Sequence, residues 1–244
     1  MKEITPSLYK MLERQIALIG KESTLKLINS SVAVIGLGGV GGYVVEGLAR
    51  SGVCNFTLFD GDKIEESNLN RQIIATNLSI GQDKVEVAKN RILSINPNAV
   101  VTCHKVFYLK ENADNYDLTN FDYIVDAIDT VSAKVEIIKR AKDLNIPIIS
   151  CMGTAGKLCI EKLRVDCISK TSICPLARVM RKQLKDIGIT ELKVVYSVEE
   201  KKDFNLGEDS VGDGQKKAYP SMIFVPAAAG LMIAKEVILH LISQ

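Results

Sequence analysis

The chain has 244 residues, of which 47% are hydrophobic and 25% are charged, and its formal net charge is +2. This length and hydrophobic content predict one substantial core, so we expect a single domain over 1–244 rather than two independent domains. The nearly neutral charge gives no strong electrostatic argument for a polyanionic partner, although local basic patches can still serve one.

The first half of the chain alternates between strand and helix patterns. Residues 1–30 predict two helices that precede the first strand. Five apolar strands follow, with helical patterns between them, which predicts an α/β fold with a doubly wound, mostly parallel, Rossmann-like sheet. The strands are expected at 32–35, 56–59, 100–106, 123–125 and 146–150, and the helices at 43–51, 84–95 and 131–144.

The second half is less regular. Strands are expected at 163–165 and 194–196 and a helix at 175–187, while the charged, glycine-rich stretch 199–219 predicts a loop. The most apolar stretch contains Pro226 and soon reaches Lys235, so it is too short for a bilayer span. We expect a final helix with one face on the sheet, and a peripheral membrane contact is the alternative.

A glycine-rich turn follows the first strand. Gly36 allows a tight turn, Gly38 lets the backbone approach a ligand, and Gly41 allows the next helix to pack closely with its N-terminus toward an anion. Asp60, after the second strand, can accept hydrogen bonds from a ribose. The order of strand, turn, helix and distal acid favours nucleotide binding over a turn without a ligand.

Further polar residues follow at the ends of the strands. Cations beside a nucleotide would stabilise developing negative charge and an acid would hold Mg²⁺, which suits phosphate chemistry better than hydride transfer. Alternatively, Arg71 and Lys84 could be ordinary solvated cations on the surface, and Asp126 and Asp129 could cap the helix that follows them. The set comprises Asp62, Asn68, Asn70, Arg71, Gln72, Lys84, Asp126 and Asp129.

These motifs resemble those of the E1-like, ThiF-type adenylating family: G-L-G-G-V-G at 36–41, D-G-D at 60–62, N-L-N-R-Q at 68–72, Lys84, and D-A-I-D at 126–129. Four more segments look like one branch of it, the tRNA threonylcarbamoyladenosine dehydratases. They are R-Q-I-A-L-I-G at 14–20, K-T-S-I-C-P-L-A at 170–177, K-V-V-Y-S at 193–197, and F-V-P-A-A-A-G at 224–230. The chain departs from the usual family pattern at Ile74 and close to Gly156.

The resemblance implies a site that uses ATP and Mg²⁺. Asp60 would bind the ribose, Arg71 and Lys84 the triphosphate, and Asp129 the metal. Arg14 would reach across a homodimer interface into the partner's site as an arginine finger. The implied nucleotide-binding set is Gly36, Gly38, Gly39, Gly41, Asp60, Asp62, Asn68, Gln72 and Asp126. The expected division is a helical extension at 1–30, a nucleotide-binding half at 31–151, and a substrate and dimer half at 152–244.

The implied activity is the ATP-dependent dehydration, by cyclisation, of threonylcarbamoyladenosine next to the tRNA anticodon through a carboxyl-adenylate. One alternative is adenylation of the C-terminal glycine of a ubiquitin-like sulfur-carrier protein, although relatives with that role often carry paired C-x-x-C zinc ligands. Another is a nucleotide-binding regulatory protein without turnover. The sequence does not indicate which accessory or sulfur-transfer proteins take part.

The six cysteines form no C-x-x-C pair and only two histidines are present, so we expect reduced core thiols and no zinc site. Cys174 could accept an acyl group, but a structural thiol is favoured. The N-terminus has no signal-peptide pattern, which predicts a cytoplasmic protein.

A basic stripe on the helix expected at 175–187 is the candidate tRNA contact, with an ordinary solvated face as the alternative. It consists of Arg178, Arg181, Lys182 and Lys185, and Lys201, Lys202, Lys216 and Lys217 in the predicted loop extend it.

Overall fold

The computed structural model of the chain describes residues 4–200 and 220–244. The four lysines of the predicted loop, Lys201, Lys202, Lys216 and Lys217, lie outside the described residues.

The centre of the fold is a seven-stranded sheet with the strand order β3-β2-β1-β4-β5-β7-β6. All neighbouring strands are parallel except β6, which runs antiparallel to β7. The expectation of a doubly wound, mostly parallel sheet is therefore confirmed. The strands are β1 (Ser31–Ile35), β2 (Asn55–Phe59), β3 (Val100–His104), β4 (Tyr123–Asp126), β5 (Ile148–Cys151), β6 (Leu163–Cys167) and β7 (Lys193–Ser197).

Helices cover both faces of the sheet and divide the core in two. One cluster of buried side chains joins the sheet to α3, α4 and α7, and a second joins its other face to α5 and α6. The helices are α1 (Pro6–Ile19), α2 (Lys21–Asn29), α3 (Gly41–Arg50), α4 (Lys84–Ile95), α5 (Val131–Asp143), α6 (Pro175–Asp186) and α7 (Phe224–Ser243). Short 3₁₀ helices are η1 (Glu66–Asn68), η2 (Ala113–Asn115), η3 (Ile160–Lys162) and η4 (Ile168–Lys170).

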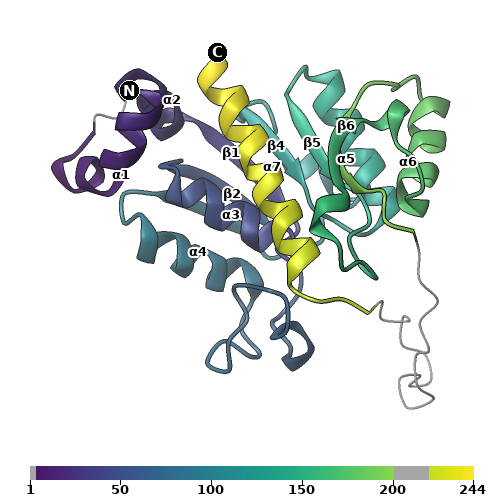
Figure 1. Cartoon of the computed structure of the whole chain (residues 1–244), viewed down its shortest axis with the longest axis horizontal. Coiled ribbons are helices and arrows are strands. Elements are labelled where there is room, and N and C mark those ends of the chain that lie inside the picture. Colours follow the sequence, from purple (N-terminus) through teal and green to yellow (C-terminus); the bar gives the residue numbers. More distant parts are fainter. Residues whose placement is uncertain (1–3, 201–219) are drawn as a thin grey trace.

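Helices α1 and α2 form the two-helix extension that the sequence predicted, at one side of the sheet (Figure 1). Leu8 and Leu12 of α1 bury their side chains with Cys54, just before β2. Gln15 Nε2 donates a hydrogen bond of 3.0 Å to the carbonyl of Ser51, at the end of α3. Helix α1 is therefore anchored where the chain enters β2, at the amino end of the parallel strands.

Helix α7 lies lengthwise beside α3 (Figure 1). By length and composition alone it is apolar enough to cross a membrane, which is weak support for a span. One of its faces, which includes Val225, Ala229, Ile233 and Val237, is buried in the core cluster with α3 and the sheet. This packing agrees with the expected core helix, and Pro226 lies in its first turn, where a missing N–H costs no helical bond.

The turn between β1 and α3 brings two backbone segments into contact. Gly36 has φ +91°, and a Cβ there would lie 2.8 Å from the carbonyl oxygen of Ala127, which follows β4. A Cβ on Gly41 would lie 1.8 Å from the carbonyl oxygen of Gly36. Only glycine fits these two places. Because the strand order reverses between β1 and β4, a crevice opens beside this turn at the carboxyl ends of the strands.

Candidate nucleotide-binding site

A cavity of about 640 Å³ opens at this crevice. Its volume lies within the range of about 300–1,000 Å³ that is common for small-molecule sites. Ten of the residues predicted for the site line it, from the glycine turn, from the end of β2 and the segment after it, from the start of α4, and from the loop after β4. They are Gly36, Gly38, Gly39, Asp60, Asp62, Asn68, Arg71, Gln72, Lys84 and Asp129.

Asp60 connects β2 to the glycine turn. Its Oδ2 accepts a hydrogen bond of 2.7 Å from the Leu37 N–H, and its Oδ1 accepts one of 2.8 Å from the Asp62 N–H. Burial raises the pKa of the Asp60 carboxyl, against the opposing effect of the Lys84 charge and the two N–H donors. Each carboxylate oxygen has a second lone pair, so the group can hold the turn and still accept from a ribose hydroxyl.

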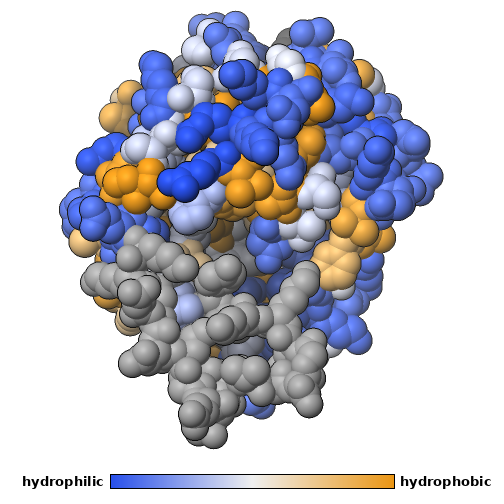
Figure 2. Space-filling view, turned by 90° about the vertical axis from the view of Figure 1, so that its right-hand side faces the viewer, coloured by the Kyte–Doolittle hydropathy of each residue, from blue (hydrophilic) through white to orange (hydrophobic). Residues whose placement is uncertain are grey.

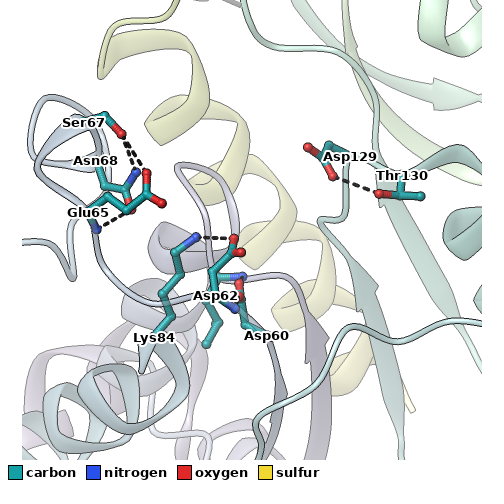
Figure 3. A network of polar contacts seen from close by, with 9 residues as sticks. Asp60, Asp62, Glu65, Ser67, Asn68, Lys84, Asp129 and Thr130 are labelled. Atoms are coloured by element: carbon teal, nitrogen blue, oxygen red, sulfur yellow. Dashed lines mark hydrogen bonds and ion pairs between the residues drawn. The ribbon is translucent and has the colours of Figure 1, made fainter. Parts of the chain in front are cut away.

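Lys84 is the first residue of α4, and its side chain is only 7% exposed. Its Nζ lies 2.8 Å from Oδ2 of Asp62, whose side chain is 52% exposed (Figure 3). A buried ammonium requires a partner. Because Asp62 lines the cavity and is half open to solvent, an anion that enters the cavity can share the Lys84 ammonium with it.

The N-L-N-R-Q motif begins at the last residue of η1 and continues into the segment after it. Asn68 is buried, and its Oδ1 accepts a hydrogen bond of 3.2 Å from the Glu65 N–H. Nη1 of Arg71 donates to the Ser67 carbonyl at 2.7 Å and to Asn70 Oδ1 at 2.9 Å. These bonds fix the Arg71 guanidinium, and Arg71 lines the cavity with its Cγ close to Gly39 of the glycine turn.

Two buried polar atoms indicate that the cavity fits a polar ligand. Among the residues that the structure describes, Gln72 Oε1 and Tyr108 OH are the buried side-chain atoms that lack a hydrogen-bond partner. Both residues line this cavity. A buried polar group without a partner costs about 1–3 kcal/mol, so native proteins rarely retain one without a role.

Asp129 lies across the cavity from Lys84 (Figure 3). It is exposed, and its Oδ1 accepts a hydrogen bond of 3.3 Å from the Thr130 hydroxyl. Within residues 4–200 and 220–244 there is no group of three or more histidine, cysteine, aspartate or glutamate side chains that could hold a metal. The single carboxylate of Asp129, together with the phosphates of a bound nucleotide, would suit Mg²⁺, because Mg²⁺ is commonly held by one or two carboxylates and substrate phosphates.

Asp126 does not line this cavity, contrary to the expectation that it binds nucleotide. It is 0% exposed and forms a 2.9 Å ion pair with Lys134 Nζ, whose side chain is also 0% exposed. The two aspartates of the D-A-I-D motif therefore face different surroundings. We reassign Asp126 to the support of the loop that carries Asp129.

Three further predicted residues lie elsewhere. Arg14 is exposed on α1, which is anchored at the opposite ends of the strands from the cavity. Cys174 is buried in the core between α6 and the sheet, in agreement with a structural thiol. Arg181 is half-buried and donates to the carbonyl of Thr171 at 2.7 Å, so it fixes the turn before α6 rather than extending the stripe. Arg178, Lys182 and Lys185 are exposed.

Two contributors to the site were not predicted. Residues 106–109, after β3, form an apolar wall of the cavity, and Phe107 on this wall is 56% exposed. The apolar run after β3 is a local signal that could have indicated it. Lys134 has no such signal, because an isolated lysine in an amphipathic helix usually faces solvent.

Comparison with known proteins agrees with this geometry. The sequence model of the ThiF family matches residues 12–244. The tRNA threonylcarbamoyladenosine dehydratase of Bacillus subtilis is 38% identical over 234 residues, which cover 93% of this chain and 92% of that protein.

Two solved structures of the Escherichia coli tRNA N6-threonylcarbamoyladenosine dehydratase, TcdA, share the fold. The complex with AMP superposes with a TM-score of 0.90 at 27% identity and covers 100% of this chain and 98% of the other. The complex with ATP has a TM-score of 0.89 at 28% identity and covers 99% and 98%. The resemblance drawn from the motifs is confirmed: the chain belongs to the ThiF family.

Proposed function

We propose that this protein is an ATP-dependent tRNA-modifying enzyme that dehydrates threonylcarbamoyladenosine next to the anticodon. The observation that carries the proposal is the convergence of Arg71, Lys84 and Asp129 on one cavity that the glycine turn also lines. The likeness over nearly the whole chain to dehydratases named for this substrate, one of them solved with ATP, supports the choice of substrate.

The chemistry makes a poor leaving group into a good one. An oxygen of the substrate carboxylate attacks the α-phosphorus of ATP, the bond to the β-phosphate oxygen breaks, and pyrophosphate leaves. The ureido nitrogen of the same side chain then attacks the acyl carbon and loses its proton, and AMP leaves with the former carboxylate oxygen. The net change in the nucleoside is the loss of one water.

The residues of the cavity would act mainly by position and charge. Arg71 and Lys84 would neutralise the triphosphate, Asp60 would bind the ribose, and the Gln72 amide would contact a polar group of the ligand. Bound Mg²⁺ would offset phosphate charge, and Asp129 is the residue placed to hold it. The Phe107 wall suits a purine ring, because aromatic faces stack on bases.

We also propose a homodimer in which Arg14 serves the partner's site. Helix α1 is fixed at the amino ends of the strands, whereas the cavity lies at their carboxyl ends. Arg14 therefore lies on an element at the opposite ends of the strands from the cavity of its own chain, and a second copy would bring it to a triphosphate. The exposed Arg178, Lys182 and Lys185 remain our candidates for contact with tRNA phosphates.

We expect the enzyme to act in the cytoplasm. Its six cysteines are free.

The test is to incubate the protein with ATP, Mg²⁺ and tRNA that carries threonylcarbamoyladenosine, then digest the tRNA and weigh the nucleoside. We expect an ATP-dependent loss of one water with release of AMP and pyrophosphate, and no loss with Asp129→Ala. If the nucleoside is unchanged and the C-terminus of a ubiquitin-like protein becomes adenylated, the sulfur-carrier reaction replaces this proposal. If no pyrophosphate is released with either substrate, both enzymatic functions are wrong.

A further inference from the structure

Lys134, in the first turn and a half of α5, is buried completely, although lysine is among the residues least often found inside proteins. Its Nζ lies 2.9 Å from Asp126 Oδ2 and donates a hydrogen bond of 3.0 Å to the carbonyl of Ile128. The ammonium therefore uses two of its three N–H donors to bind Asp126, at the end of β4, and the loop that joins β4 to α5.

Asp126 completes the arrangement from the other side. Its Oδ1 accepts a hydrogen bond of 3.1 Å from the Ile128 N–H, and its Oδ2 accepts one of 2.5 Å from the Ser150 hydroxyl on β5. Both backbone polar groups of Ile128 are thus bonded to the two members of one buried ion pair. We call Asp126, Lys134 and the Ile128 backbone the buried clamp.

The loop between the buried clamp and the glycine turn has little room to move. The Ala127 N–H donates to the Ile35 carbonyl at 2.8 Å, and the backbone of Ala127 and Ile128 lies against Gly36. The next residue along the chain is Asp129, whose carboxylate is exposed in the cavity and accepts from Thr130. The peptide that precedes Asp129 is therefore held in place, and with it the point from which the Asp129 side chain extends.

We propose that Lys134 is a positioning residue that acts through Ile128 to aim the Asp129 carboxylate at the phosphates and their metal. A pair of apolar side chains could fill the same space and stabilise the fold equally well, but it could not hold the N–H and the carbonyl of one residue at once. The inference rests on the proposed role of Asp129, and it adds Lys134 and Asp126 as residues that control that role.

The central test is Lys134→Met, which keeps the length of the side chain and removes its charge and donors. The measurement is thermal unfolding of the ATP-bound protein without tRNA, at a series of Mg²⁺ concentrations. We expect the Mg²⁺ concentration that gives half-maximal stabilisation to rise about tenfold or more, because loss of a group that orients a metal ligand typically lowers metal affinity about 10–100-fold. We expect kcat to fall by a similar factor while the KM for ATP changes by less than about threefold, since the other nucleotide contacts remain.

Three variants separate positioning from stability. Lys139→Met makes the same change at an exposed lysine of α5 and should leave the Mg²⁺ requirement unchanged. Lys134→Arg keeps the charge and donors and should recover much of the wild-type requirement. Asp126→Asn with Lys134→Met leaves no unpaired buried charge, so it should fold if Lys134→Met does not, yet it should still show the raised Mg²⁺ requirement.

Coupling to Asp129 is the most direct check. If Lys134 acts through Asp129, adding Lys134→Met to Asp129→Asn should cost little beyond Asp129→Asn alone. The proposal is overturned if Lys134→Met, or the double variant with Asp126→Asn, folds and keeps the wild-type Mg²⁺ requirement. It is also overturned if the losses caused by Lys134→Met and Asp129→Asn multiply in full when the two are combined. The Mg²⁺ measurement needs no tRNA, so it tests the role of Lys134 separately from the proposed activity. The role of Lys134 can be wrong while the wild-type enzyme still dehydrates its substrate, and it can be right while the proposed substrate is wrong.

Discussion

At the residue scale, one wall of the cavity contains a buried tyrosine, Tyr108. Tyr108 packs edge-to-face on Phe59, with ring centroids 5.8 Å apart, and it is 2% exposed. Its hydroxyl lacks a partner, and burial raises the pKa of Tyr108 to about 12. The hydroxyl is therefore a neutral donor at every physiological pH.

We expect Tyr108→Phe to stabilise the protein without ligands. The substitution removes an unsatisfied buried hydroxyl and keeps the aromatic packing, so the free energy of unfolding in urea should rise by about 1 kcal/mol. Tyr9→Phe, at a site 46% exposed, should change it little. A loss of stability in Tyr108→Phe would mean that the hydroxyl has a partner in solution.

The Asp60 carboxyl gives a pH-dependent prediction. Because burial raises its pKa, the native state binds this proton more tightly than the unfolded chain does. The contribution of Asp60 to stability is therefore most favourable at low pH and falls as pH rises from the ordinary aspartate value of about 3.9 through the native pKa.

Asp60→Asn removes this titration. Urea unfolding at a series of pH values should show the stability of the wild type, relative to Asp60→Asn, decreasing over an interval that begins near the ordinary aspartate pKa of about 3.9, and levelling off once the native carboxyl has lost its proton. A difference that increases over that interval would show that the native pKa is lowered instead.

At the element scale, α7 and α3 approach each other at glycines. A Cβ on Gly230 would lie 2.5 Å from the carbonyl oxygen of Val40 and 2.7 Å from Tyr43 Cβ, and one on Gly47 would lie 2.8 Å from Ala234 Cβ. Val40 also lines the cavity. The contact between the helices thus fixes the start of α3, where the glycine turn ends.

Gly230→Ala should test this contact. Alanine is a better helix former than glycine by about 1 kcal/mol, so propensity alone predicts stabilisation. We expect the reverse, a loss of about 1–3 kcal/mol with weaker ATP binding, because the added methyl must push α7 away from α3. Leu239→Ala on the exposed face of α7 should cost less than about 0.5 kcal/mol.

The elements also show what the sequence could and could not predict. The mostly parallel sheet, the glycine turn and the cavity residues from Asp60 to Lys84 follow from local patterns and spacing along the chain. The roles of Asp126 and Asp129 do not, because the partner that distinguishes them, Lys134, comes from the next helix. Arg181 likewise shares the spacing of its stripe but bonds to Thr171. Periodicity identified the strand at 163–165 without giving the antiparallel direction of β6.

At the scale of the whole molecule, the separation of α1 from the cavity is the reason for proposing a site shared by two chains. Arg14 belongs to the amino ends of the strands and Asp129 to their carboxyl ends. The basic residues Arg178, Lys182 and Lys185 of α6 are exposed. The side of the molecule on which α6 lies in Figure 1 carries large hydrophilic regions (Figure 2).

Mixing variants should reveal a shared site. Arg14→Ala and Asp129→Ala proteins should each be nearly inactive, but a mixed dimer would contain one site that lacks neither side chain. Equal amounts with free subunit exchange give mixed dimers in about half of the population, so activity should recover to roughly a quarter of the wild-type value. No recovery despite proven exchange would place Arg14 in its own subunit's site or in a purely structural role.

The packing of α7 on α3 also has a consequence for the order of folding during synthesis. Residues 31–151, with the glycine turn and most of the cavity, leave the ribosome well before residues 224–243, yet α7 supplies Val225, Ala229 and Ile233 to their core. Until α7 arrives, that part of the core is open to water and the start of α3 lacks its neighbour. A nascent chain should therefore gain the ability to bind nucleotide only late, when its final helix has been released.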